Sequence, residues 1–172
     1  SVGEEIRMEF VLEILSAVRN THSEFRNHLK KGVPLYLTES TENSRGLQQI
    51  LSIIQDQVSK GIRVVWEHEA EFDERRLLVR TAAKGVRIGF ELEYSEALSE
   101  DLLKCRKKLM KVMKGKEKLL ETIQKPEYDS KVPEIIRQKH NTSLETFQAQ
   151  ESELNATISD LESTINRSIS AN

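Results

Sequence analysis

The sequence has a single cysteine, Cys105, so no disulfide can form within the chain. It also lacks any apolar run approaching the roughly 20 residues of a membrane-spanning helix, and no signal peptide opens it. These absences lead us to expect an intracellular protein. The chain does not begin with methionine and its helical pattern begins almost at once, so we expect it to be a piece of a longer protein.

Motifs of catalytic chemistry are also missing. The four histidines are His22, His28, His68 and His140. None is spaced with another histidine or with the cysteine as zinc ligands require, and no glycine-rich phosphate loop is present. The acidic residues around His68, from Glu67 to Asp73, have two interpretations: a metal or acid–base site, or a solvated connection between strands, which is the more usual one. We therefore predict a binding module with no catalytic residue, metal ligand or cofactor of its own.

Residues 98–172 contain the strongest pattern, two stretches in which apolar residues recur about every 3.5 positions. The stretches are Leu102, Cys105, Leu109, Val112, Leu119 and Ile123, then Leu144, Phe147, Leu154, Ile158, Leu161 and Ile165. Such a seam must be covered, and a loop of about ten residues allows the two helices to cover each other. We predict a long antiparallel coiled-coil hairpin. Lys116 and Glu151 interrupt its seam, and with a fold point near residue 129 we expect them to miss each other.

Basic residues form a second pattern on the first of these helices. Lys104, Lys107, Lys111, Lys114 and Lys118 are three or four residues apart, and Arg106, Lys108 and Lys116 widen the stripe. From Lys104 to Lys118 the net charge is +7, from eight basic residues and Glu117, whereas the second helix is acidic. Two interpretations stay open. The lysines either form a solvated face that pairs with the acidic helix, or they bind the phosphates of a polyanion.

The first half of the chain predicts a small α+β domain at residues 33–97, preceded by an amphipathic helix. Strands are predicted at 33–37, 62–66, 75–81 and 86–94, with one helix at 47–58. The last strand alternates apolar and polar residues, which is typical of an antiparallel sheet with one buried face. The aromatic residues Tyr36, Trp66, Phe72 and Tyr94 of this domain either stack on bases or, as is more usual for strand aromatics, belong to the core. The predicted fold class is therefore α+β: a small antiparallel sheet with one or two packed helices, followed by the coiled-coil hairpin.

Three stretches of the sequence are also informative in their order. They are Val18-Arg19-Asn20 with Val33-Pro34-Leu35, then Gly85 to Leu92 leading into the charged helix, then Tyr128 to Lys139 between the heptad stretches. This order resembles the C-terminal region of valyl-tRNA synthetases. The first stretch is similar to the end of the anticodon-binding helical domain, and the second to the strand before the C-terminal coiled coil. The third is similar to the tip of that coiled coil, where an aromatic residue, a lysine and a proline precede the second helix.

The resemblance implies three domains and a function. Residues 1–32 would be the last helix of the anticodon-binding domain, 33–97 the small α+β domain and 98–172 the coiled-coil arm. In the family this arm contacts the outer corner of tRNA and supports aminoacylation by a valine-tRNA ligase, a class I aminoacyl-tRNA synthetase of protein biosynthesis. The ATP-binding motifs of that enzyme are absent from these residues, so ATP and magnesium would belong to the parent.

The resemblance and the basic pattern together predict a set of RNA-binding residues. They are Lys104, Arg106, Lys107, Lys108, Lys111, Lys114 and Lys118 on the stripe, Lys131, Arg137 and Lys139 near the tip, and Arg19. The expected partner is valine-accepting tRNA, with other translation proteins as further candidates, and neither DNA nor a membrane is expected. The expected compartment is the cytoplasm, and the mitochondrion stays open as a second one. The alternative function is a coiled-coil module for protein interaction or dimerisation without RNA binding.

Overall fold

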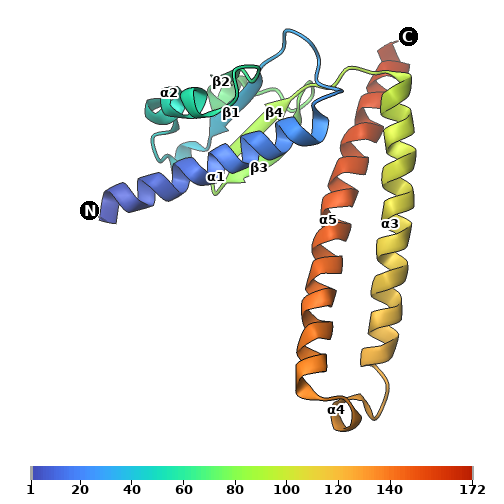
Figure 1. Cartoon of the computed structure of the whole chain (residues 1–172). Helices are drawn as coiled ribbons and strands as arrows, with labels where there is room; N and C mark the ends of the chain where they lie inside the picture. The colour runs from blue at the N-terminus through green and yellow to red at the C-terminus, as the bar shows by residue number, and fades with distance from the viewer. Residues whose placement is uncertain (1, 172) are drawn as a thin grey trace. The chain divides into compact units, whose positions relative to one another are not determined.

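The computed structural model describes residues 2–171, leaving aside the side chains of residues 2 and 6, so the outermost residues of the first and last predicted domains, 1 and 172, lie outside it. The chain forms two compact units, the first ending at Glu93 and the second beginning at Tyr94 (Figure 1). None of the helices in residues 2–171 is both long and apolar enough to cross a lipid bilayer. The predicted α+β class is confirmed by a four-stranded sheet with helices packed on it.

Within its described residues, 2–93, the first unit contains two helices, four strands and two short 3₁₀ turns. In chain order these are α1 (Val2–Phe25), β1 (Leu35–Glu39), η1 (Thr41–Asn43), α2 (Leu47–Gln57), β2 (Val64–Trp66), η2 (Glu69–Glu71), β3 (Leu78–Ala83) and β4 (Val86–Phe90). The strand order is β2-β1-β4-β3. α1 packs against β3 and α2, so it belongs to the same unit as the sheet.

The prediction of an antiparallel sheet is wrong, because the sheet is mixed. β1 pairs with β2 in parallel, with Leu35 opposite Val64, and with β4 antiparallel. The reason is α2, which forms a helical crossover and returns the chain to the end of the sheet from which β1 started. The amide of Gln55 on α2 fixes the edge strand, donating to the carbonyl of Ile62 and accepting from the N–H of Val64, both at 2.8 Å.

A carboxylate at the end of β1 holds the start of the crossover. Glu39 accepts hydrogen bonds from the backbone N–H groups of Arg45 and Leu47 and from the hydroxyl of Ser44. Its charge therefore lies at the N-terminal end of α2, whose first N–H groups have no partner within the helix. A carboxylate in this position stabilises a helix by roughly 0.3–1 kcal/mol.

The sheet is buried on both faces, although the sequence indicated one. Ile88 and Phe90 of β4 are fully buried, as the alternation predicted, and the ring of Phe90 stacks on that of Phe25 in α1 with centres 4.9 Å apart. On the opposite face, the irregular segment between β2 and β3 covers Gly89. A Cβ atom placed at Gly89 would lie 2.7 Å from the ring of Phe72 and from the side chain of Leu77. The guanidinium of Arg87 lies over the same ring, 4.9 Å from its centre.

The second unit consists of α3 (Glu96–Ile123), α4 (Tyr128–Lys131) and α5 (Glu134–Ala171). Ser95 caps α3, since its hydroxyl accepts the N–H of Leu98 at 3.2 Å. Figure 1 shows α3 and α5 side by side, and their ion pairs Arg106–Glu162 and Lys116–Glu151 show that they run antiparallel. At Gly115 of α3 the two helices come so close that a Cβ atom would lie 3.0 Å from the ring of Phe147.

We expect Gly89→Ala to lower the free energy of unfolding by about 1–3 kcal/mol, because the new methyl group must displace the packed ring of Phe72. Urea denaturation followed by circular dichroism measures this loss. Gly61→Ala is the control, since nothing lies within 4 Å of a Cβ at that glycine. Equal stability of the two variants would show that the β2–β3 segment does not pack on the sheet as described.

Candidate nucleic-acid interface

The seam between α3 and α5 decides which residues of α3 face outward. Leu102 is buried, and the remaining seam positions Cys105, Leu109, Val112, Lys116, Leu119 and Ile123 are half-buried. Lys104, Lys107, Lys111, Lys114 and Lys118, hereafter the lysine stripe, are all exposed. The heptad register thus places the lysine stripe on the side of α3 that points away from α5.

The exposed lysines have few acidic neighbours. Within residues 2–171 no carboxylate oxygen lies within 4.0 Å of the Nζ atoms of Lys107, Lys108, Lys111, Lys114 or Lys118. Lys104 lies 3.9 Å from Asp101, one turn away on the same helix. The interpretation in which the acidic α5 neutralises the stripe therefore receives no support from the contacts. Like charges three and four residues apart repel each other mildly, and a bound polyanion would relieve that repulsion.

Arg106 has a different role from the lysine stripe, although the sequence grouped them together. Its Nη2 atom donates to Glu162 of α5 at 2.6 Å, so this guanidinium links the two helices. Its position two residues from Lys104 turns it away from the stripe and toward the flank of the helix pair. Of the residues predicted to widen the stripe, Arg106 and Lys116 each form an ion pair with α5.

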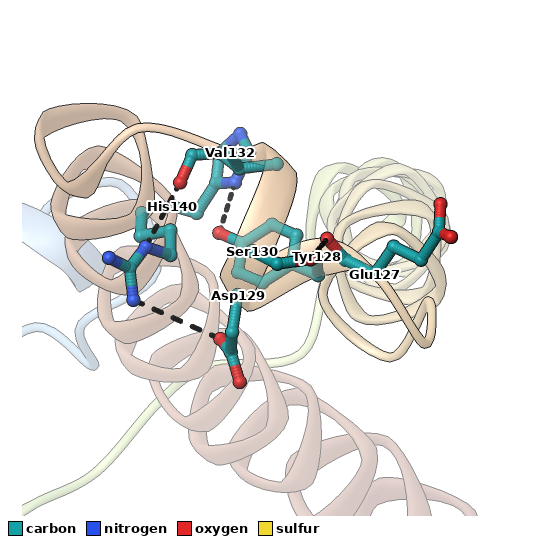
Figure 2. Close-up of polar contacts among 7 residues, drawn as sticks. Glu127, Tyr128, Asp129, Ser130, Val132 and His140 are labelled. Atoms are coloured by element: carbon teal, nitrogen blue, oxygen red, sulfur yellow. Dashed lines mark hydrogen bonds and ion pairs between the residues drawn. The ribbon is translucent and has the colours of Figure 1, made fainter.

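The cations near the tip, which comprises residues 124–133, mostly bond to the tip itself. Figure 2 shows the tip residues Asp129 and Val132, which take part in these contacts. Lys131 pairs with Glu127 one turn earlier. Arg137 donates to the carbonyl of Val132 at 3.2 Å and lies 4.0 Å from Asp129. Lys139 is exposed and, among the described residues, has no ion pair. Lys131 and Arg137 therefore have partners within the tip, although the side chain of Lys131 is 71% exposed, and Lys139 is exposed without an ion pair to any described residue.

An aromatic pair anchors the tip to the second helix. The hydroxyl of Tyr128 lies 2.6 Å from Nδ1 of His140, and the two rings stack with centres 5.7 Å apart. Tyr128 is 8% exposed, so this aromatic residue of the tip motif is part of the packing. It is not displayed for stacking on a base.

Arg19, the candidate from the first helix, also bonds within the protein. Its Nη2 atom donates to the carbonyl of Gln57 at 2.7 Å. That carbonyl is among the last of α2, and helix C-terminal carbonyls lack partners within their own helix. Arg19 therefore joins α1 to the end of α2, far along the chain from the lysine stripe.

The acidic segment around His68 forms turns, with hydrogen bonds of its own. Nδ1 of His68 accepts the N–H of Ala70 at 3.1 Å, and the carboxylate of Glu69 accepts the N–H of Thr41 at 3.1 Å. In the part of the chain that the structure describes, no group of three histidine, cysteine or acidic side chains is placed to hold a metal ion.

The prediction that Lys116 and Glu151 miss each other is wrong. Their side chains form an ion pair at 2.8 Å across the seam, each about one quarter exposed (26% and 25%). The prediction placed the fold point near residue 129. The Arg106–Glu162 and Lys116–Glu151 pairs are instead centred on residues 133–134, because most of the connecting segment, α4 included, precedes that centre.

Sequence reasoning also missed three exposed apolar residues on α3. Leu103, Met110 and Met113 are 57%, 58% and 50% exposed. They fall outside the seam positions, so a search for heptads passes over them. The seven-residue spacing of Leu103 and Met110 was the signal that could have revealed them.

Comparisons with known proteins add no assignment to this geometry. No protein-family model matches the chain, and no curated protein matches it significantly.

We expect a double-mutant cycle on the seam pair to show coupling. Lys116→Ala and Glu151→Ala should each destabilise the helix pair by about 1 kcal/mol, since each leaves one half-buried charge without its partner. The double variant should lose less than the sum of the two, by roughly 0.5–1 kcal/mol. Thermal and urea unfolding followed by helical circular dichroism measure all four proteins. Lys108→Ala, an exposed control, should change stability by less than about 0.5 kcal/mol, and strictly additive losses would contradict the pair.

Proposed function

We propose that the second unit is an RNA-binding coiled-coil arm and that the lysine stripe is its phosphate-binding edge. The observation that carries the proposal is a row of exposed lysines on one side of α3, of which only Lys104 has an acidic residue within 4.0 Å in residues 2–171. The row extends about 20 Å along the helix, at 1.5 Å per residue. A line of ammonium groups on a rigid rod suits a folded polyanion whose phosphates follow one another along a strand.

The chemistry of the stripe favours recognition of backbone and shape over sequence. Lysine ammonium groups bind phosphate as point charges, without the planar fork with which arginine recognises guanine. The described part of the stripe also presents no aromatic residue on which a base could stack. Phosphate and sugar contacts would therefore supply most of the affinity, as they do in shape-directed binding of folded RNA.

The resemblance to valyl-tRNA synthetases specifies the RNA within this proposal. The chain would be a non-catalytic C-terminal part of a valine-tRNA ligase or of a related protein, acting in the cytoplasm. Its arm would rest on the outer corner of valine-accepting tRNA and support aminoacylation by the parent, which would bring ATP and magnesium. Lys139 would add a phosphate contact near the tip. Lys131, Arg137 and Arg19 would act through the structure they hold together.

We expect tRNA binding by this protein to depend on the lysine stripe and on salt. Changing Lys107, Lys111 and Lys114 to Glu should raise the Kd for tRNA by at least about tenfold. It should also reduce the slope of log K against log salt by roughly two to three, about one for each phosphate that the variant no longer neutralises. Fluorescence anisotropy with a labelled tRNA transcript, measured across a salt series, gives both quantities.

The matched control changes Lys31, Lys60 and Lys84 to Glu, three exposed lysines of the first unit, and so alters the net charge equally. This variant should bind tRNA within about twofold of the unaltered protein, because general attraction through net charge is weaker than local phosphate contact. Binding of a duplex DNA similar in length to the tRNA is measured in the same way, as a second ligand. Equal loss of binding in both variants, or no binding at low salt, would contradict the stripe as the site.

A further inference from the structure

One flank of α3 between the seam and the lysine stripe is apolar and uncovered. Leu103, Met110 and Met113 are each at least half exposed there. Exposed single apolar residues are common, but three that share one side of a single helix within eleven residues form a patch that protein surfaces tend to cover. The patch is distinct from the proposed phosphate-binding edge, because its side chains contain no charge.

Charged residues bracket this patch in an ordered way. Arg106, Met110, Met113 and Glu117 are spaced by four, three and four residues, so they lie on one face of the helix. The sequence along that face is basic, apolar, apolar, acidic. Read in the opposite direction it is acidic, apolar, apolar, basic, so two copies placed antiparallel would set each charge against its opposite.

A groove continues the same flank toward the tip. It has a volume of about 450 Å³ and is lined by Met113, Leu120 and Glu121, together with Lys116, Glu117, Gln124 and Glu151. Its lining combines the apolar side chains of Met113 and Leu120 with the carboxylates of Glu117, Glu121 and Glu151. Glu117 and Glu121 are exposed, and in the described residues no cation lies within 4.0 Å of either carboxylate. The groove therefore fits an apolar side chain that is accompanied by a basic neighbour.

We propose that a second copy of this chain covers the flank, with the two α3 helices packed antiparallel about a two-fold axis. The axis passes between Met110 and Met113, which places Met110 of one copy against Met113 of the other. In this register Arg106 faces Glu117 of the second copy, and Leu103 faces the groove at Leu120. Such a contact is isologous, since each residue pair occurs twice. It extends over about 25 Å of helix and converts two helix pairs into a four-helix arrangement.

The proposed dimer does not depend on RNA binding. The lysine stripe lies beside the dimer flank and stays exposed in the dimer. A two-fold axis perpendicular to both α3 helices keeps each stripe on the same side of the assembly. Arg106 also retains Glu162, because its guanidinium has five N–H donors and is about half exposed in the single copy.

Sedimentation equilibrium over a concentration series up to about 1 mM, the range of weak complexes, tests the dimer directly. The unaltered protein should reach twice the mass of one chain. Changing Met110 and Met113 to Glu should raise the dimer Kd by at least about a hundredfold, because four carboxylates then face one another at the axis. Both positions are exposed, so helical circular dichroism should be unchanged. A monomer at every concentration, or equal association of both proteins, would overturn the proposal.

A charge exchange tests the register. One variant combines Arg106→Glu with Glu162→Arg, which preserves the ion pair to α5 while reversing the charge on the flank. The other carries Glu117→Arg. Each alone should be monomeric, because like charges then face each other twice. An equimolar mixture should recover association, since every pair is again opposite. Failure of the mixture to associate while the unaltered protein dimerises would overturn this antiparallel arrangement. Replacing Met110 and Met113 with the uncharged Gln should weaken the dimer and leave RNA binding within about twofold of normal, because no charge is added beside the lysine stripe, which separates the two proposals.

Discussion

Burial of the seam between α3 and α5 is the constraint on which the surface of the second unit depends. Two long helices with few aromatic residues have little other means of removing apolar surface from water. Once the seam is fixed, every other residue of α3 has a fixed direction. The Lys116–Glu151 pair then sets how far one helix is shifted along the other, because a half-buried charge must meet its partner to avoid an uncompensated cost.

The first unit uses polar side chains of another kind, those that join segments distant in the sequence. Glu39 ties the end of β1 to the start of α2, and Arg19 ties α1 to the end of α2. Gln55 holds the edge strand β2 by two backbone bonds. Each of these contacts satisfies backbone groups that secondary structure leaves without partners, which makes the unit's short sheet a single packed body.

How much of this structure the sequence predicts depends on whether a feature is periodic. The helices, the seam and the exposed direction of the lysine stripe follow from repeated spacing, and they were predictable. The Lys116–Glu151 contact was not, because a period defines a face without defining where the chain folds back. The parallel pairing of β1 with β2 and the cover that Phe72 provides over Gly89 arise from the paths of connecting segments, which have no period.

The close approach of Gly115 to Phe147 also limits how related sequences can differ. A glycine inside a long helix costs about 1 kcal/mol of stability relative to alanine, so we expect another interaction to compensate for it. Here the missing side chain makes room for the ring of Phe147, since a methyl group at residue 115 would lie 3.0 Å from that ring. Either change alone is unfavourable: a larger residue at 115 crowds the ring, and a smaller one at 147 leaves a void. These two positions are therefore expected to vary together among homologues, as a glycine with a large ring or an alanine with a smaller side chain.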